Sequence, residues 1–473
     1  MQIMKTSPTP TMHVLRRPAY IDTGVARYKI GSARVSFSAA RRIVCSHQML
    51  PFNHSHDSSS STSNSTSLLR LPLPAPINCR FPVRCHPQYE SIKDECEQWG
   101  LSLFDSGGSS PVSAAARQAY EKGVYSLFTA TAYPSPRVSP QRLTLGAKLY
   151  IWLFMLDDAI DEADALTAAE LGNGFLRVIT DTADLSPNSS SSAFSAKDAR
   201  IERFMERLRV DVWEKMLEEM PPDLQRRFVD DCVKSTEAMK EMWQLRRGVT
   251  TSEAEDDGDA IDVIKEKIVA LRLLDGFCWP VLTLVEYMLG IELPDPAGNT
   301  EMGMLVQKLK TNAGKHALYV NDMISFGKEL VRKDAQSVVG ALVKERRLEG
   351  GHAGPLVELS AERSETMQQV LKEIWQMLQE QERICDDLLA QIRSLAAHTD
   401  GGDIISPMYA EGLCDLLAGH LYWSTLTWRY VGPHPIPWNI SPSYIVIPSS
   451  PLHSISFLCQ QAKSAISSHG RHQ

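Results

Sequence analysis

Acidic residues follow directly on an apolar run at residues 153–164, where the sequence reads LFMLDDAIDEAD. In a helix, Asp157 and Asp161 would lie one turn apart, about 6 Å along the axis, and Asp158 would lie about 60° from Asp161 around it. Carboxylates gathered in this way suit hard cations such as Mg²⁺, which takes carboxylate oxygens together with waters and substrate phosphates. An exposed helix end is the ordinary interpretation of such acids. The apolar and aromatic residues directly before them, Trp152 to Leu156, instead favour a metal site at the edge of an apolar cavity.

A second polar set with helical spacing lies at residues 319–330, YVNDMISFGKEL. Asn321, Ser325 and Glu329 are four residues apart, so on a helix they form one stripe that drifts by only about 40° per step. An amide oxygen, a hydroxyl and a carboxylate make a plausible further site for a hard cation. An ordinary polar helix face would explain this set alone, but the two sets together predict a metal-dependent site.

Apolar periodicity predicts the helices that position these residues. Apolar side chains recur every three or four residues over 201–220, before two prolines, and again over 367–395. No alternating strand and no repeat of fixed period is evident beyond residue 88. SPNSSSS at 186–192 and TSEAEDDGDA at 251–260 are expected to be loops between helices.

Composition divides the chain into three parts. Residues 1–89 hold 11 Lys and Arg and only two acids, whereas the remainder carries 38 basic and 55 acidic residues, a net charge of −17. Residues 1–85 also contain HDSSSSTSNSTS, a low-complexity stretch that cannot build a core. We expect a disordered arm at 1–85, one all-α domain at 86–430 and a Pro- and Ser-rich tail at 431–473.

The composition of the N-terminal arm is typical of an organelle transit peptide. Its Ser and Thr content favours a chloroplast address over a mitochondrial one, so a plastid location is expected. Without such an address the protein is expected in the cytoplasm.

Charge, hydropathy and cysteine usage exclude several other classes of protein. An acidic body argues against a nucleic-acid binder, and no run of about 18 apolar residues predicts a membrane span. Nine Cys are scattered without a CxxC, which indicates neither a disulfide framework nor a zinc site. The sequence leaves the oligomeric state open.

The two polar sets resemble the metal motifs of class I terpene synthases, in particular the single-domain bacterial and fungal kind that is also found in plants. WSTLTWRY at 423–430 resembles the C-terminal signature of that family. The resemblance implies a single-domain helical bundle around a central apolar cavity. It implies metal ligands at Asp157, Asp158, Asp161, Asn321, Ser325 and Glu329, and basic or hydroxyl groups at the diphosphate at Lys328, Arg429 and Tyr430.

The resemblance also implies an enzyme, a carbon–oxygen lyase that ionises a prenyl diphosphate, with farnesyl or geranyl diphosphate expected. Three Mg²⁺ ions, for which Mn²⁺ could substitute, would act as Lewis acids on the diphosphate leaving group. The carbocation would become a mono- or sesquiterpene between aromatic walls that stabilise positive charge. Candidates for those walls are Phe154, Phe277, Trp279 and Trp423.

The stretch LRLLDGFCWP at 271–280 resembles the segment that triggers ionisation in that family. The resemblance implies Arg272 as the diphosphate sensor, Asp275 as a linker, and Gly276 as the residue whose carbonyl faces the substrate. Helix geometry supports the last role, because the N–H that would bond the Gly276 carbonyl belongs to residue 280, and Pro280 has none.

Two alternatives share parts of this pattern. A chain-elongating prenyltransferase has the same fold, but it carries a second aspartate-rich motif where this sequence has the Asn-Ser-Glu set. A non-catalytic helical isoprenoid-binding protein would have no need of intact metal and diphosphate residues. No DxDD motif is present, so protonation-initiated cyclisation is not indicated.

Overall fold

The computed structural model describes most of the chain between residues 69 and 447. The described residues are 14–15, 69–73, 75–105, 114–181, 199–246, 261–332, 337–349, 361–398, 403–432, 434, 436, 438–439 and 443–447. The predicted loops at 186–192 and 251–260, most of the N-terminal arm and the tail beyond residue 447 lie outside them.

The described part of the chain is almost entirely helical, which confirms the predicted all-α fold. The first half contains α2 (Tyr89–Asp105), α3 (Ala114–Glu121), α4 (Tyr125–Ala132), α5 (Pro140–Glu162), α6 (Ala165–Asp181), α7 (Ala199–Leu208), the π-helical turn η1 (Arg209–Trp213), α8 (Glu214–Leu217) and α9 (Pro222–Arg246). The second half contains α10 (Ile261–Asp275), α11 (Cys278–Leu289), α12 (Glu301–Arg332), α13 (Val338–Glu349), α14 (Ala361–His398), α15 (Ile405–Ser424) and α16 (Trp428–Val431).

Helix α5 begins at a cap and is fixed by aromatic packing. The Ser139 hydroxyl accepts a hydrogen bond from the backbone N–H of Arg142 at 3.1 Å, and Pro140 takes the first helical position, where no N–H is needed. Further along, the fully buried Trp152 stacks on Phe204 at a centroid distance of 4.7 Å and donates its indole N–H to the Phe204 carbonyl at 3.0 Å. This contact holds the acidic end of α5 in place.

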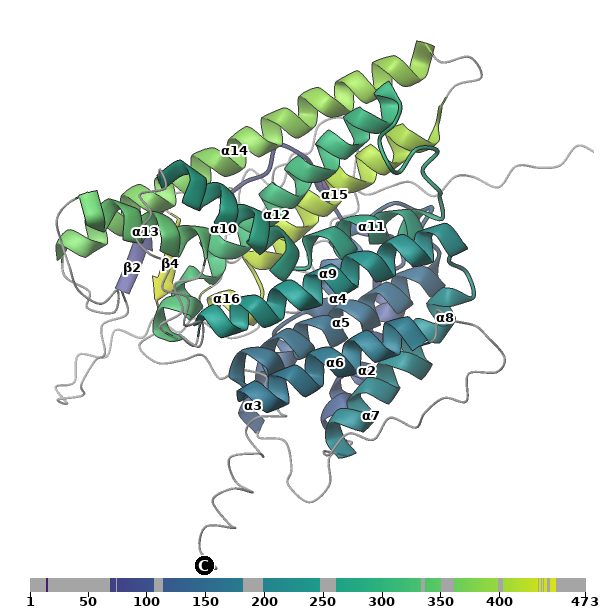
Figure 1. Cartoon of the computed structure of the whole chain (residues 1–473), viewed down its shortest axis with the longest axis horizontal. Coiled ribbons are helices and arrows are strands. Elements are labelled where there is room, and N and C mark those ends of the chain that lie inside the picture. Colours follow the sequence, from purple (N-terminus) through teal and green to yellow (C-terminus); the bar gives the residue numbers. More distant parts are fainter. Residues whose placement is uncertain are drawn as a thin grey trace, which may run out of the picture.

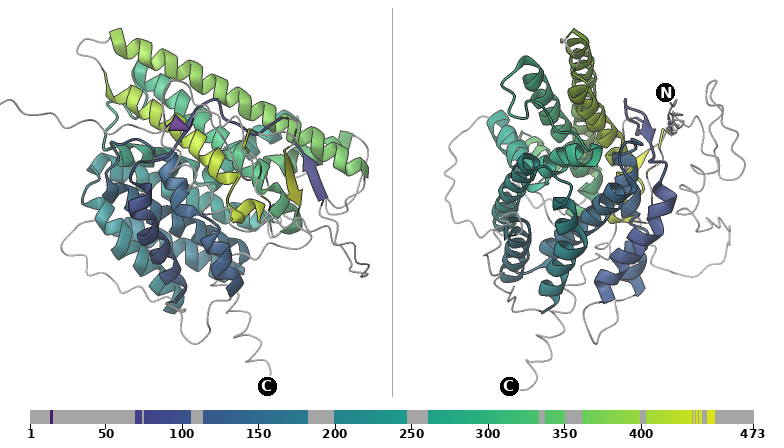
Figure 2. Two further views of the ribbon diagram at one scale, coloured as in Figure 1. Left: turned by 180° about the vertical axis from the view of Figure 1, so that it is seen from behind. Right: turned by 90° about the vertical axis from the view of Figure 1, so that its right-hand side faces the viewer.

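The helices form two groups that face each other across the molecule. The long helices α12 and α14 lie side by side with α15 along one edge, and α5, α6 and α9 make up the other group (Figure 1). Figure 2 shows the same two groups from behind and from the side. Helices α4 and α11 pack against α15 and so join the groups, with one continuous apolar core between them.

The segment around Gly276 is broken into two helices. Helix α10 ends at Asp275 and α11 begins at Cys278, with a bend of 48°. Phe277 between them has a φ of 55°, in the left-handed region that bulky residues rarely adopt. The sequence predicts a helix with one carbonyl freed by Pro280. The structure instead breaks the helix, and Pro280 becomes the third residue of α11, where a backbone N–H has no intrahelical partner.

The packed domain extends beyond the expected boundaries of 86 and 430. Strand β2 (Leu69–Pro72) pairs antiparallel with β4 (Tyr444–Ile447), and β1 (Val14–Leu15) pairs with β3 (Val83–Arg84). Leu71 and Ile77 are fully buried, so the arm is not disordered from residue 69 onward. The strands escaped the sequence analysis because they are only two to four residues long, too short to show an alternating pattern.

Across the described residues, no single helix is both long enough and apolar enough to cross a bilayer. The bent pair Ile268–Asp275 and Cys278–Leu289 meets the length and composition criteria only when its two parts are taken together.

Candidate active site

A largely apolar cavity of about 190 Å³ lies between the two helix groups, and polar residues gather on part of its wall. The polar residues that line it are Asp157, Asp161, Arg272, Asp275, Asn321, Ser325, Lys328, Glu329, His420, Arg429 and Tyr430. All the predicted site residues except Asp158 therefore line this cavity, and Gly276 lines it as well. Asp158 is buried beside it.

The three aspartates at the end of α5 come together as the sequence predicts, but they differ in their surroundings. Carboxylate oxygens of Asp157, Asp158 and Asp161 lie within 4.8 Å of one another. The Asp157 side chain is 48% exposed, whereas that of Asp158 is 3% exposed and accepts hydrogen bonds from Lys328 and Arg429, each at 3.0 Å. Asp157 and Asp161 thus line the cavity, where they could bind a cation, while Asp158 is held by basic groups.

The Asn-Ser-Glu set lies on α12, on the same cavity wall. The Asn321 amide donates to the Tyr430 hydroxyl at 2.9 Å, which fixes the orientation of its carbonyl oxygen. The Ser325 hydroxyl donates to Glu329, one turn further along α12. These contacts order the oxygen atoms of the second set before any ligand binds.

Arg429 is the central basic group of the site, and α16 positions it. Thr427 caps this short helix by accepting the Arg429 backbone N–H at 3.3 Å, and its own hydroxyl donates to the Gly123 carbonyl at 2.9 Å. The guanidinium donates to Asp157, Asp158 and the Tyr430 hydroxyl. Burial opposes its charge, but Asp158, Tyr430 and Asp157 outweigh that effect and raise its pKa well above the ordinary value, so Arg429 stays cationic.

Arg272 is held by two carboxylates, one of which the sequence analysis missed. It donates to Asp275 on its own helix and to Asp322 on α12, the latter at 2.7 Å. Asp322 is fully buried and also accepts the backbone N–H of Val338 at 2.7 Å. Burial opposes the Arg272 charge, yet Asp322 and then Asp275 raise its pKa well above the usual range. Its Nε is buried with no hydrogen-bond partner among the described residues, so one N–H remains for a ligand.

Aromatic rings form the apolar wall, but two of the four predicted rings, Trp279 and Trp423, do not line the cavity. Phe154 and Phe277 line the cavity, and Trp423 stacks behind Phe154 at a centroid distance of 4.8 Å. The Arg429 guanidinium lies 5.0 Å from the Phe154 ring centroid. Trp279 does not belong to this wall, because it lines a separate polar pocket with Lys310, on another side of α11.

The donor set suits a hard divalent cation. Asp157, Asp161, Asn321, Ser325 and Glu329 offer only oxygen atoms, and all five line one cavity. Mg²⁺ prefers such oxygens and keeps coordination positions for water and phosphate. The nearby cations Arg272, Lys328 and Arg429 match an anionic group that such a metal would bring.

Comparisons with known proteins agree with this geometry. Residues 148–354 match the family model described as "terpene synthase family 2, C-terminal metal binding". Alpha-muurolene synthase of Coprinopsis cinerea is 24% identical over 357 residues, covering 75% of this chain and 72% of that protein. The (3S,6E)-nerolidol synthase of Selaginella moellendorffii is 24% identical over 361 residues, covering 74% and 81%.

Solved structures share the fold at low sequence identity. The linalool/nerolidol synthase of Streptomyces clavuligerus in complex with 2-fluorogeranyl diphosphate aligns with a TM-score of 0.51 at 19% identity, covering 72% of this chain and all of that one. Aristolochene synthase of Penicillium roqueforti aligns with a TM-score of 0.50 at 18% identity, covering 75% and 100%. Residues 148–354 thus match a terpene synthase metal-binding family, the chain is similar to curated terpene synthases over about three quarters of its length, and it shares the helical fold of solved class I terpene synthases.

Proposed function

We propose that this protein is a Mg²⁺-dependent terpene synthase that ionises farnesyl or geranyl diphosphate and converts the carbocation to a sesqui- or monoterpene. One observation carries the proposal. Two oxygen-donor sets on α5 and α12 and three buried cations share a single, otherwise apolar cavity.

The basic groups would bind and orient the diphosphate. Arg272, Lys328 and Arg429 come from three different helices, and each is held by a buried carboxylate, Asp322 or Asp158. Ion-paired cations keep a fixed position, so they need little rearrangement when charge develops on the leaving group. The Tyr430 hydroxyl adds a hydrogen-bonding group at the same place.

The apolar part of the cavity would hold the hydrocarbon chain. When bound, Mg²⁺ would supply Lewis-acid neutralisation of the departing diphosphate. The faces of Phe154 and Phe128, which meet at a centroid distance of 5.7 Å, would stabilise positive charge through their quadrupoles. Their packing excludes water, which would otherwise end the reaction early.

Farnesyl diphosphate is the first substrate to test. The names of several relatives describe sesquiterpene synthases, and one solved neighbour holds a geranyl diphosphate analogue. These names support substrates of 15 and 10 carbons without deciding between them. Geranylgeranyl diphosphate belongs in the same assay as a longer comparison.

The test is product formation by the purified full chain. Each diphosphate is incubated with Mg²⁺, with Mn²⁺ and with EDTA, and the extract is analysed by gas chromatography. Volatile terpenes that depend on the metal support the proposal. Longer prenyl diphosphates would point to a chain-elongating prenyltransferase, and binding without turnover to an isoprenoid-binding protein.

We also propose that the N-terminal segment directs the protein to the plastid. Its basic, Ser-rich and acid-poor composition supports this proposal. A fluorescent protein fused behind residues 1–68 should accumulate in chloroplasts of plant cells. Fluorescence that stays in the cytosol would contradict the plastid address and leave the enzymatic proposal intact.

A further inference from the structure

His420 lines the cavity from a helix that carries none of the predicted diphosphate groups. It belongs to α15, nine residues before Arg429, and neither metal motif includes it. Its ring meets Phe128 edge to face at a centroid distance of 5.9 Å, so it faces the part of the cavity where the hydrocarbon would lie. Its Nδ1 atom is buried with no hydrogen-bond partner among the described residues.

His420 is an uncharged base under ordinary conditions. Burial, and then the nearby His316, lower the pKa of His420 to about 3, so the imidazole is neutral near pH 7 and keeps a lone pair. A carbocation makes the hydrogens on its neighbouring carbons strongly acidic, and a weak base suffices if it is well placed. Position therefore matters more here than basicity.

The other titratable groups on the apolar wall are poor candidates for this role. The Tyr150 hydroxyl is bonded to Tyr133, and burial raises its pKa well above the ordinary value. Burial raises the pKa of the Cys278 thiol to about 12, and this thiol points to the Gly276 carbonyl at 3.9 Å. Both groups keep their protons, so neither offers a free basic lone pair.

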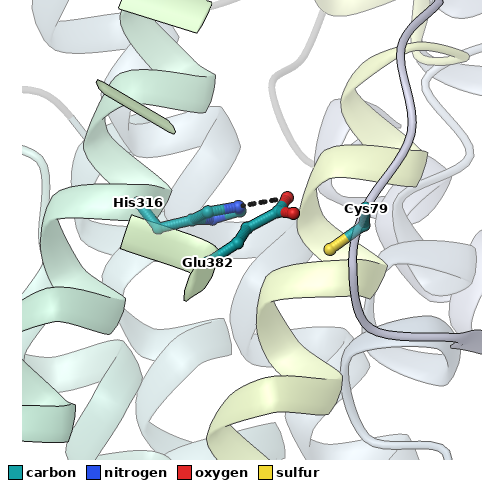
Figure 3. A group of neighbouring side chains, drawn as sticks. All are labelled: Cys79, His316 and Glu382. Atoms are coloured by element: carbon teal, nitrogen blue, oxygen red, sulfur yellow. Dashed lines mark hydrogen bonds and ion pairs between the residues drawn. The ribbon is translucent and has the colours of Figure 1, made fainter. Parts of the chain in front are cut away.

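Besides burial, a second histidine lowers the pKa of His420, and that histidine contacts a buried carboxylate. His316 on α12 approaches Glu382 on α14 with its Nε2 atom 3.3 Å from the carboxylate, and Cys79 lies beside them (Figure 3). The other Glu382 oxygen accepts the backbone N–H of Arg80 at 2.8 Å. If Nε2–H of His316 donates to Glu382, its buried Nδ1, which has no partner among the described residues, is an acceptor.

The Cys79, His316 and Glu382 group has the ligand types of a metal site, but its contacts favour a polar relay. Both Glu382 oxygens already accept hydrogen bonds from donors of the chain. Burial and the Glu382 charge raise the pKa of Cys79 well above its usual value, whereas metal binding needs the thiolate. The carboxylate would instead compensate positive charge that arrives on the histidines.

We propose that His420 is the base that ends the carbocation reaction, an inference that rests on the proposed terpene synthase function. An imidazole lone pair takes a proton from the carbon next to the cationic carbon, and the electron pair of that C–H bond forms the alkene. The proton ends on His420, which becomes an imidazolium, and the nearby Glu382 carboxylate compensates the charge. The cation is thereby neutralised and the imidazolium carries the positive charge, so atoms and electrons balance.

The experiment compares His420→Phe, His420→Asn and the control His398→Phe in the full chain with Mg²⁺ and farnesyl diphosphate. His398 is exposed at the end of α14 and does not line the cavity. Released diphosphate and the terpene products are measured in the same reactions, and melting temperatures check that each variant folds. Phe keeps a ring of similar size without nitrogen, and Asn is smaller, so the two variants separate the loss of a base from a change of shape.

In both His420 variants we expect the main wild-type olefin per diphosphate released to fall by about 10²-fold, with other olefins or alcohols in its place. Wild-type product ratios in either folded variant would overturn the proposal. If the product ratios changed in opposite directions in His420→Phe and His420→Asn, according to the size of the new side chain, His420 would only shape the cavity. That result would also overturn the proposal. A wild-type protein that releases no diphosphate would refute the proposed function itself, and with it any base for a carbocation.

Discussion

Asp158 differs from Asp157 and Asp161 because its carboxylate is buried in ion pairs with basic residues of the protein. It is buried and binds Lys328 and Arg429, whereas Asp157 and Asp161 line the cavity. One aspartate-rich motif thus places two carboxylates at the cavity and one carboxylate against the buried basic groups. The three aspartates look equivalent in the sequence motif, but their surroundings in the structure differ.

Replacing Asp157 by Ala tests the outward ligand. Loss of one carboxylate from the metal set should lower product formation by about 10³-fold, equivalent to roughly 4 kcal/mol of transition-state stabilisation. The melting temperature should stay close to that of the wild type, because the side chain is 48% exposed. Asp387→Ala, which removes one acid from an exposed ion pair on α14, is the matched control for charge. Equal activity of the two variants would contradict the metal assignment.

Asp322 allows a second test, of the carboxylate that holds Arg272. Asp322→Ala would leave a buried guanidinium with one carboxylate fewer and the Val338 N–H without its acceptor. We expect the free energy of unfolding to fall by about 3 kcal/mol, measured by urea denaturation. Asp386→Ala removes the partner of Arg80 in an exposed pair and should cost less than about 1 kcal/mol. Similar losses in both variants would show that burial of the Arg272 pair has no special role.

At the scale of elements, helix ends carry most of the site. The end of α5 holds the acids, the junction of α10 and α11 holds Arg272 and Gly276, and the start of α16 holds Arg429. Side chains at helix ends can converge from several directions on one cavity. The long helix α12 is the exception, and it contributes a stripe from its last three turns.

The break between α10 and α11 makes a testable prediction about Pro280. Pro280→Ala adds an N–H and lets a continuous helix form, and Phe277 would then leave its strained left-handed conformation, a gain of about 1 kcal/mol. The carbonyl of Gly276, a residue that lines the cavity, would then bond within the helix and would not be available to a substrate. We expect kcat to fall by about 10²-fold with little change in KM, and the melting temperature to hold or rise.

Pro222→Ala is the control for Pro280→Ala, because Pro222 stands at the first position of α9, where its ring only starts a helix. Its kinetics should match the wild type. If Pro280→Ala also turns over at the wild-type rate with the same products, the break serves packing alone.

Close contact between α4 and α15 gives another prediction. A Cβ atom added at Gly419 would lie 2.3 Å from the backbone carbon of Thr131, and backbone cannot move aside cheaply. Gly419→Ala should therefore lower the free energy of unfolding by about 2 kcal/mol or more. At Gly172 in α6 the nearest atom would be 3.4 Å away, so Gly172→Ala should be neutral or raise stability by up to about 1 kcal/mol. Thermal unfolding of both variants tests this difference, and equal melting temperatures would contradict it.

At the scale of the whole molecule, residues that share a helix face could be predicted from their spacing in the sequence. Residues that depend on contacts between distant helices could not. The acids of α5 and the stripe on α12 follow from helical periodicity, as does the all-α fold. Asp322 and His420 look like ordinary helix residues in the sequence, because their role depends on partners 50 or more residues away, such as Arg272. Trp279 was misplaced because it shares a face of α11 with Thr283 and Glu286, whereas Cys278, Val281 and Leu282 on another face line the cavity.

The N-terminal boundary of the domain was also misplaced, because it depends on packing that the sequence does not reveal. Residues 69–85 look like part of a basic arm, yet Leu71, Leu73 and Ile77 are buried in the core. Arg84 is paired with Asp415 on α15, and Arg80 reaches α14. The segment therefore ties together helices that are distant in the sequence, and it belongs to the enzyme and not to the proposed address.

Two truncations test this boundary. Removal of residues 1–68 deletes the two-residue β1 but keeps β2 and every site residue, so product formation should be unchanged and the melting temperature nearly so. Removal of residues 1–75 also deletes β2, with the buried side chains of Leu71 and Leu73, and leaves β4 without its partner. Each buried Leu contributes about 2 kcal/mol, so this protein should lose roughly 4 kcal/mol of stability and melt at a clearly lower temperature. Equal melting temperatures for the two truncated proteins would show that the domain begins after residue 75 and that β2 is dispensable.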